Sequence, residues 1–125
     1  MIKISASEME VMAIIWNSDV DKGLPGSDIA ARIPNEKQWS VRTVNTLLSR
    51  LVDKGALATV RDGRRFLYKP LISKEDYADR QTGQLIDRLF GGRSAPLVAH
   101  LAKTGKLSKA DVKAIKNILD QLEEE

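Results

Sequence analysis

Residues 40–54 read SVRTVNTLLSRLVDK, and residues 55–70 continue as GALATVRDGRRFLYKP. Ser40 is a favourable helix N-cap and Gly55 favours the left-handed conformation that ends a helix, so the first segment is predicted to be one helix. Its apolar residues recur at helical spacing and are expected to face a core. They are Val41, Val44, Leu48, Leu51 and Val52.

A β-hairpin is predicted directly after this helix. Residues 56–60 and 65–69 have the composition of strands, and the turn between them contains Asp62-Gly63, a strong hairpin signal. Pro70 ends the second strand, because proline has no backbone N–H to donate to a sheet.

Two shorter helices are expected upstream. Ser7 and Glu10 have the S-x-x-E spacing of a capping box, which begins a helix that runs to Trp16. Residues 17–25 are predicted to be a loop, and residues 27–33 a second helix that begins on a serine cap. Helix, helix, helix and hairpin in this order is the arrangement of a winged helix-turn-helix, in which the hairpin is the wing.

The remaining chain is predicted to be helical, with helices over residues 73–90 and 94–103 and from Ser108 onward. The last helix has apolar residues at alternating spacings of three and four, which form a narrow seam suited to helix pairing. The expected fold class is mainly α with a small β-hairpin wing (α+β). It combines a winged helix-turn-helix DNA-binding domain over residues 1–72 with a C-terminal three-helix dimerisation domain over residues 73–125.

Three short helices bury only a thin core by themselves, so this region is expected to pack on a second copy of the chain. Packing of the last helix on the two preceding helices of the same chain is the alternative. The predicted dimer interface consists of Leu85, Ile86, Leu89, Phe90, Leu97, Leu101, Val112, Ile115, Leu119 and Leu122.

Positive charge is concentrated in one part of the chain. The net charge is +3, and residues 38–69 alone contain seven Lys or Arg against two Asp. Such a segment is the footprint of a polyanionic partner, although charge by itself also fits an ordinary solvated face.

Composition excludes several function classes. The chain has no cysteine, which rules out disulfides and thiolate metal sites. It has no G-x-S-x-G, P-loop or dinucleotide-binding pattern, so we expect neither an enzyme nor a cofactor or metal. No apolar run reaches the length of a membrane span, and we expect a cytoplasmic protein.

The polar side of the helix over residues 40–54 has short hydrogen-bonding side chains flanked by arginines, whereas an ordinary solvated face more often has Glu and Lys. Arg bonds guanine, Asn bonds adenine, and Thr offers a hydroxyl and a methyl group to base edges. The wing tip adds three arginines suited to phosphate or minor-groove contact, although charges there also prevent edge-to-edge pairing. The candidate DNA-binding residues are Ser40, Arg42, Thr43, Asn45, Thr46, Arg50, Arg61, Arg64 and Arg65.

The aromatic residues are given structural roles. Trp16 and Phe66 are expected in the core, and Tyr68, on the same strand face as Phe66, is expected to be partly buried with it. Trp39 precedes the helix cap and is expected to act as a hydrophobic staple, with contact to a DNA backbone as the alternative. His100 lies among apolar residues and is expected in a core or an interface, because no second strong metal ligand accompanies it.

The chain resembles the penicillinase-repressor family, the BlaI/MecI group, to which copper-responsive CopY-type repressors are related. The resemblance rests on motifs spread over nearly the whole chain. They are WSVRTVNTLL at residues 39–48 with Arg50-Leu51, KGAL at residues 54–57, GRRFLY at residues 63–68, SKEDY at residues 73–77, Asn117-Ile118-Leu119, and the segment from Ile4-Ser5 to Trp16.

The resemblance implies a homodimer with N-terminal winged-helix heads that represses transcription by binding inverted-repeat operators in double-stranded DNA. It implies base-reading roles for Arg42, Thr43, Thr46 and Arg50, and wing contacts from Arg64 and Arg65. We therefore predict a sequence-specific DNA-binding repressor of the penicillinase and methicillin-resistance type. The alternative is a winged-helix module that binds protein partners, which exposed apolar residues on the helix over residues 40–54 would favour.

The chain departs from the family at two regulatory positions. Penicillinase repressors are inactivated by proteolysis at an Asn-Phe bond in the fifth helix, and this chain has His100-Leu101 there. These two residues are the candidate cleavage site for a regulatory protease. The copper-responsive members have C-terminal cysteines, which this chain lacks, so the sequence does not name the inducing signal.

Overall fold

The computed structural model describes residues 2–18 and 21–124, so residues 19 and 20 of the predicted loop lie outside the described residues. The chain divides into two units, Met1–Tyr77 and Ala78–Glu125, which we call the head and the C-terminal unit. The head contains α1 (Ala6–Trp16), β1 (Leu24–Pro25), α2 (Gly26–Arg32), the 3-10 helix η1 (Asn35–Lys37), α3 (Val41–Asp53), β2 (Leu57–Asp62) and β3 (Arg65–Pro70). Helix α4 (Lys74–Leu89) begins in the head, and α5 (Ser94–Lys103) and α6 (Lys109–Glu123) follow it.

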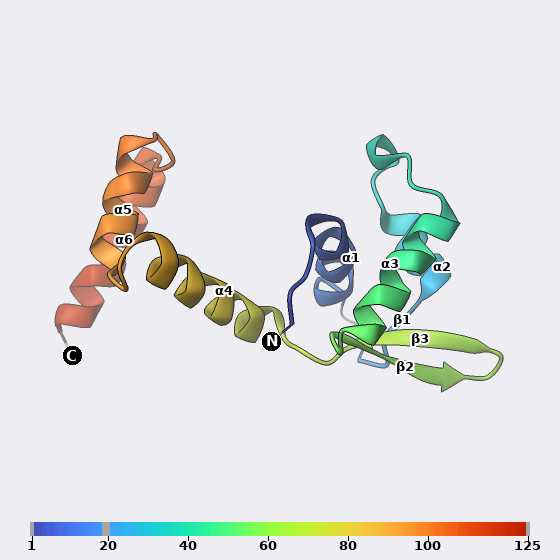
Figure 1. The fold of residues 1–125 in the computed structure, drawn as a ribbon. Coiled ribbons are helices and arrows are strands. Elements are labelled where there is room, and N and C mark those ends of the chain that lie inside the picture. The colour runs from blue at the N-terminus through green and yellow to red at the C-terminus, as the bar shows by residue number, and fades with distance from the viewer. Residues whose placement is uncertain (1, 19–20, 125) are drawn as a thin grey trace. The chain divides into compact units, whose positions relative to one another are not determined.

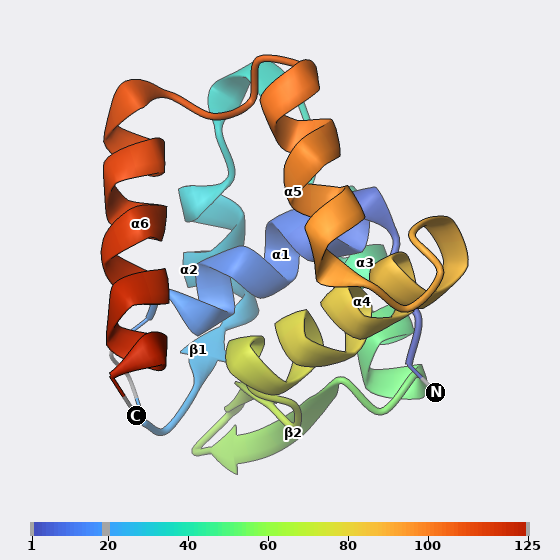
Figure 2. The same cartoon turned by 90° about the vertical axis from the view of Figure 1, so that its left-hand side faces the viewer.

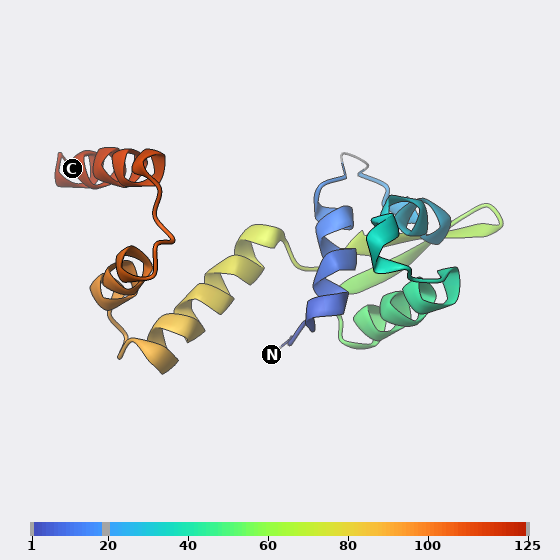
Figure 3. The ribbon, with the colours of Figure 1, turned by 90° about the horizontal axis from the view of Figure 1, so that it is seen from above.

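The head has the predicted winged-helix order. Three helices precede an antiparallel sheet with strand order β1-β3-β2, and the β2–β3 hairpin extends past the helices (Figures 1 and 3). The short strand β1 was not predicted. It consists of Leu24 and Pro25, which pair with Tyr68 and Leu67 of β3, so tertiary pairing rather than local sequence creates it.

Helix α3 forms as predicted. The Ser40 hydroxyl accepts a hydrogen bond from the Thr43 backbone N–H at 3.1 Å, which caps the first turn. Gly55 ends the helix at a φ of 81°, a conformation that side chains with a Cβ rarely adopt. Trp39 is half-buried against the core, which is consistent with the predicted hydrophobic staple at the start of this helix.

The residues that α3 buries differ in part from the apolar residues predicted to face the core. Val44, Leu48 and Leu51 are buried as expected, and Leu47 is buried with them because it lies one turn from both Val44 and Leu51. The prediction for Val41 is wrong. Its side chain is 63% exposed, because it stands in the first turn, ahead of the part of α3 that the core covers.

The predicted start of α1 is also wrong. The capping box is made by Ser5 and Glu8, two residues earlier than the predicted Ser7 and Glu10. The side chain of Glu8 is 2% exposed and its carboxylate accepts a hydrogen bond from the ammonium of Lys54, which follows α3. Two serine–glutamate pairs have the right local spacing, and this long-range ion pair favours the earlier one.

Helix α2 is capped two residues earlier than predicted, and its cap position lacks a side-chain hydrogen bond. Pro25 occupies the N-cap position in place of the predicted Ser27. Proline sets the backbone angle in advance at this point, and the preceding strand fixes where the helix begins.

The start of α4 is anchored to the head by Trp16. Its indole N–H donates to the Ile72 carbonyl at 3.0 Å, and its ring centroid lies 5.9 Å from that of Tyr77 in the first turn of α4. Trp16 itself is half-buried against the core rather than fully enclosed. The contact ties the winged-helix core to the segment through which the C-terminal unit is connected.

The C-terminal unit has helices and turns but no interior of its own. Figure 2 shows α4, α5 and α6 as separate helices joined by turns. Residues 78–124 include no buried side chain. Of the two places predicted for His100, the core is wrong, because its side chain is exposed, and an interface stays a prediction. Its ring lies 5.9 Å from the ring of Phe90.

The part of the chain that the structure describes contains neither a candidate membrane-spanning helix nor a candidate metal site. None of its helices combines the length and hydropathy of a bilayer span. In the same residues, no three His, Asp or Glu side chains gather where they would hold a metal ion.

The Glu8 ion pair makes the stability of the head depend on pH. Burial alone would raise the pKa of Glu8, but the hydrogen bonds from Lys54 and Ser5 and the charge of Lys54 hold it below 4.5. The folded state therefore binds fewer protons than the unfolded state near that pH. This stabilisation is complete above pH 4.5 and is lost as the pH falls through the lowered folded value.

We predict that Glu8→Gln lowers the free energy of unfolding by about 1–3 kcal/mol at neutral pH, because a charge-assisted hydrogen bond is lost. The difference from the wild type should narrow below pH 4.5 in urea unfolding measured across pH. Glu10→Gln is the matched control, since Glu10 pairs with Lys37 at 3.1 Å but both side chains are at least 40% exposed. Equal losses in the two variants, or a loss at Glu8 that does not change with pH, would contradict this role.

Candidate nucleic-acid interface

The outer face of α3 presents all of its predicted site residues to solvent. Because Val44, Leu47, Leu48 and Leu51 face the core, the remaining side of the helix is polar. Its exposed polar side chains are Arg42, Thr43, Asn45, Thr46, Ser49, Arg50 and, at the end of the helix, Asp53, and Ser40 is exposed at the cap. The structure therefore brings the predicted α3 residues together on one surface.

Hydrogen bonds within α3 limit what two of these side chains offer. The Thr46 hydroxyl donates to the Arg42 carbonyl at 3.0 Å, so its proton is used within the helix. Its lone pairs and methyl group remain for a partner. The hydroxyls of Thr43 and Ser40 lie 3.1 Å apart and share one hydrogen bond, which joins the cap to the first turn of this surface.

Val41 is a residue of this surface that sequence analysis missed. It stands beside Arg42 and Thr43 in the first turn, and its two methyl groups are chemically suited to the methyl group of thymine. The signal that could have found it is its position, since early residues of a recognition helix reach base edges. One valine among polar neighbours does not form the apolar patch that a protein-binding helix needs.

The wing presents its three predicted arginines at the end of the β2–β3 hairpin (Figure 1). Arg61, Arg64 and Arg65 are all exposed. Arg65 pairs with Asp62 at 3.3 Å, and the Arg61 Nε donates to the Gly63 carbonyl at 3.2 Å. The turn therefore orders two of the three arginines and leaves the hairpin tip with a net positive charge.

The core prediction for Phe66 is wrong, because its side chain is 54% exposed. Tyr68 is half-buried, as predicted, and packs against the core. The hairpin extends beyond the helices on which it packs. The core therefore covers β3 at Tyr68 but not at Phe66.

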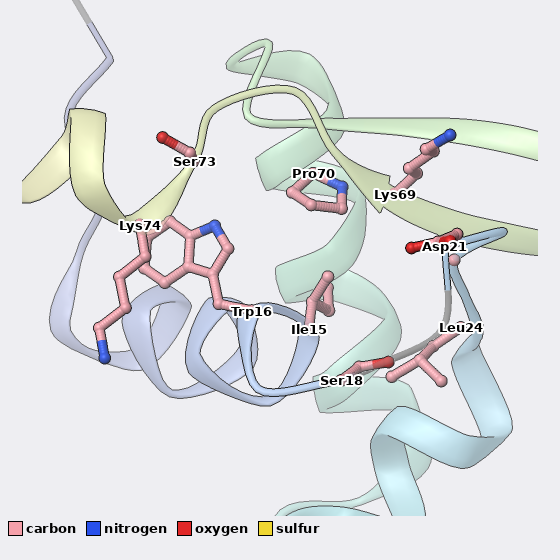
Figure 4. Close-up of a pocket in the computed structure, with 10 residues that line it drawn as sticks. Ile15, Trp16, Ser18, Asp21, Leu24, Lys69, Pro70, Ser73 and Lys74 are labelled. Carbon is pink, nitrogen blue, oxygen red and sulfur yellow. The ribbon is translucent and has the colours of Figure 1, made fainter.

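A hollow of about 360 Å³ also lies on the head, beside the end of α1 and the end of β3. Ile15, Trp16 and Pro70 lie along it, with Lys69 and Lys74 among its lining residues (Figure 4). Ligand pockets have polar groups that converge on the ligand. The ammonium groups of these lysines instead point to opposite sides, away from the Trp16 indole, so we assign no ligand to the hollow.

The residues predicted for a dimer interface are solvent-accessible in the single chain. Leu85, Leu89, Val112, Leu119 and Leu122 are exposed. Those that are half-buried are Ile86, Phe90, Leu97, Leu101 and Ile115. Ile118 of α6 is 56% exposed and extends this apolar surface beyond the predicted seam.

Together these features define a winged-helix protein whose arginine-bearing wing and polar recognition helix occupy one unit and whose apolar helices occupy another. The sequence profile of the penicillinase repressor family matches residues 4–121. The chain belongs to the penicillinase repressor family.

Individual relatives agree with this assignment. The penicillinase repressor of Bacillus licheniformis is 29% identical over 119 residues, which cover 95% of this chain and 91% of that protein. The methicillin resistance regulatory protein MecI of Staphylococcus aureus (strain N315) is 30% identical over 119 residues, which cover 95% of this chain and 94% of that protein. The solution structure of the monomeric form of BlaI from Bacillus licheniformis, in complex with the blaP half-operator, has a TM-score of 0.51 and 36% identity. It covers 60% of this chain and 88% of that one.

Proposed function

We propose that the protein is a transcriptional repressor that binds double-stranded operator DNA as a homodimer, with α3 in the major groove and the wing on the flanking backbone. The observation that carries the proposal is the outer face of α3, where the exposed polar side chains from Arg42 to Arg50 are all of types that bond bases or phosphates and the acidic Asp53 stands only at the end of the helix. Family membership and the half-operator complex of BlaI support the same function.

The positions of the arginines indicate which of them contacts bases and which contacts phosphates. Arg42 stands in the first turn of α3, from which side chains reach base edges, and it is placed to read guanine. Arg64 stands at the wing turn, where a flexible cation is suited to phosphates of any sequence. Base contacts give sequence preference, whereas phosphate contacts give affinity that falls with salt.

The C-terminal unit supports dimerisation. Its apolar side chains have no interior to enter, and leaving so many of them in water is unfavourable for a soluble helical unit. A second copy presents the same apolar surface and would cover it symmetrically. Two heads joined in this way match an operator built from two inverted half-sites.

Dimerisation also provides a route to release from DNA. Cutting the chain between the head and α6 leaves each head to bind one half-site alone, which forfeits an effective-concentration gain of about 10²–10⁴. The bond between His100 and Leu101 lies inside α5, with His100 exposed. A regulatory protease that acts there would have to unwind this helix before cutting it.

The first experiment compares two arginines in binding to duplex fragments selected from the source genome and to random duplexes of equal length. We predict that Arg42→Ala costs about 1–3 kcal/mol on the selected fragment and little on random DNA. Arg64→Ala should weaken both equally and, because each of the two heads loses one phosphate contact, reduce the log–log salt slope of the dimer by about 1.8. Arg80→Ala, which removes a charge from α4 outside the head, is the matched control.

Two results would count against the assignment. If the wild type bound no genomic fragment at low salt, DNA binding itself would be wrong. If Arg42→Ala left the ratio of selected to random affinity unchanged, base reading by α3 would be wrong even though the protein binds DNA.

The second experiment tests the dimer. Leu119 is 52% exposed in the single chain, so Leu119→Asp should leave each chain folded. In a desolvated interface the new charge should weaken the dimer by several kcal/mol, about 10²–10³-fold or more in dissociation constant. Sedimentation equilibrium should show a monomer, whereas Asn117→Asp, on the opposite side of α6, should stay dimeric. A Leu119→Asp variant that remains dimeric at micromolar concentration would place the interface elsewhere.

A further inference from the structure

The wing has an exposed aromatic side chain that lies beyond the core of the head. Phe66 is 54% exposed, although an aromatic ring is among the most favourable groups to bury. It lies on β3 directly opposite Arg61 of β2. A phenylalanine that contributes little to the core of the head is free to serve a partner.

The strand register shows which way Phe66 faces. Residues directly opposite each other in a sheet share a face, and every second pair along the hairpin lies on that same face. The pair Arg61–Phe66 therefore shares its face with Thr59–Tyr68 and with Leu57. Leu57 is buried in the core and Tyr68 packs against it, so Phe66 continues the core-facing side of the sheet outward.

This face lies beside the recognition surface of α3. A Cβ at Gly26 would meet the Tyr68 ring at 3.5 Å and the Asn45 amide oxygen at 3.6 Å, so these two side chains converge on the same point. Phe66 stands two residues further out than Tyr68, which is about 7 Å along the strand. Phe66 therefore continues outward the same sheet face on which Tyr68 approaches Asn45 of α3.

Arg61 holds the ring in place and supplies charge next to it. Its guanidinium carbon lies 5.9 Å from the centre of the Phe66 ring, within the range of a cation–π contact. The Arg61 Nε also bonds the Gly63 carbonyl of the wing turn. The result is an apolar ring beside cations, a combination that complements the apolar sugar edges and anionic phosphates of a DNA groove.

Resting on the proposed operator binding, we propose that Phe66 is a direct DNA contact of the wing. Its ring packs against deoxyribose in the groove next to the one that α3 enters, while Arg61 neutralises a neighbouring phosphate. Because deoxyribose is the same at every base pair, Phe66 contributes affinity rather than sequence preference. Its contribution is independent of salt, since it releases no counterions.

The test measures binding of the full-length chain to a selected genomic fragment and to a random duplex over a series of salt concentrations. Phe66→Ala should weaken binding to both by about tenfold per head, and so by about 100-fold for a dimer with both wings on the DNA, because roughly 50–60 Å² of apolar surface per head stays in water. Its salt slope should equal that of the wild type. Arg61→Ala should instead reduce the slope by about 1.8, because each of the two wings loses one phosphate contact. Phe66→Leu, which keeps an apolar side chain, should retain most of the affinity.

Val60→Ala is the matched control, because Val60 is 41% exposed on the opposite face of the same hairpin. It should bind like the wild type, and thermal unfolding should show that each variant folds. Wild-type affinity in Phe66→Ala would overturn the proposal and point to a protein partner for the ring. A loss accompanied by a reduced slope would also overturn it, because Phe66 would then act only by positioning Arg61. Failure of the wild type to bind any duplex would instead refute the proposed function.

Discussion

The apolar side of α3 is packed against α1, α2 and the sheet, with Leu48 and Leu51 fully removed from solvent. Each buried leucine contributes about 1.5–3 kcal/mol, and turning the helix to bury Arg42 or Asn45 would cost several kcal/mol more. This packing sets which side chains of α3 face outward. Because β2 follows α3 after Gly55, it also fixes where the wing begins. The polar outer face of α3 is therefore the side of the helix that the core leaves uncovered.

The C-terminal unit differs from the head because its apolar side chains are not buried within the single chain. The head encloses a core of its own, whereas residues 78–124 bury no side chain. A single chain can therefore position a reading surface, but it leaves the apolar helices in water. The contact of Trp16 with Ile72 and Tyr77 sets the head on the segment that leads into those helices.

The sequence predicted the parts of the fold that local chemistry decides. Ser40, Gly55 and the Asp62-Gly63 turn act through their own backbone, so α3 and the hairpin could be placed. The features that could not be predicted from the sequence depend on residues distant in the chain. Lys54 selects the cap at Ser5, and the pairing of β1 needs β3 to be present. In the candidate site, the arginines could be foreseen from charge, whereas the exposure of Val41 and Phe66 follows from where the core ends.

We expect two heads, held together by their C-terminal units, to read two half-sites with α3. The most direct measurement is the mass of the wild-type complex with a selected genomic fragment, by sedimentation, together with a hydroxyl-radical footprint of the same complex. The account predicts two chains per duplex and two inverted half-sites whose centres are about 10–10.5 bp apart or a multiple of that spacing. One chain per duplex with a single protected half-site would contradict it.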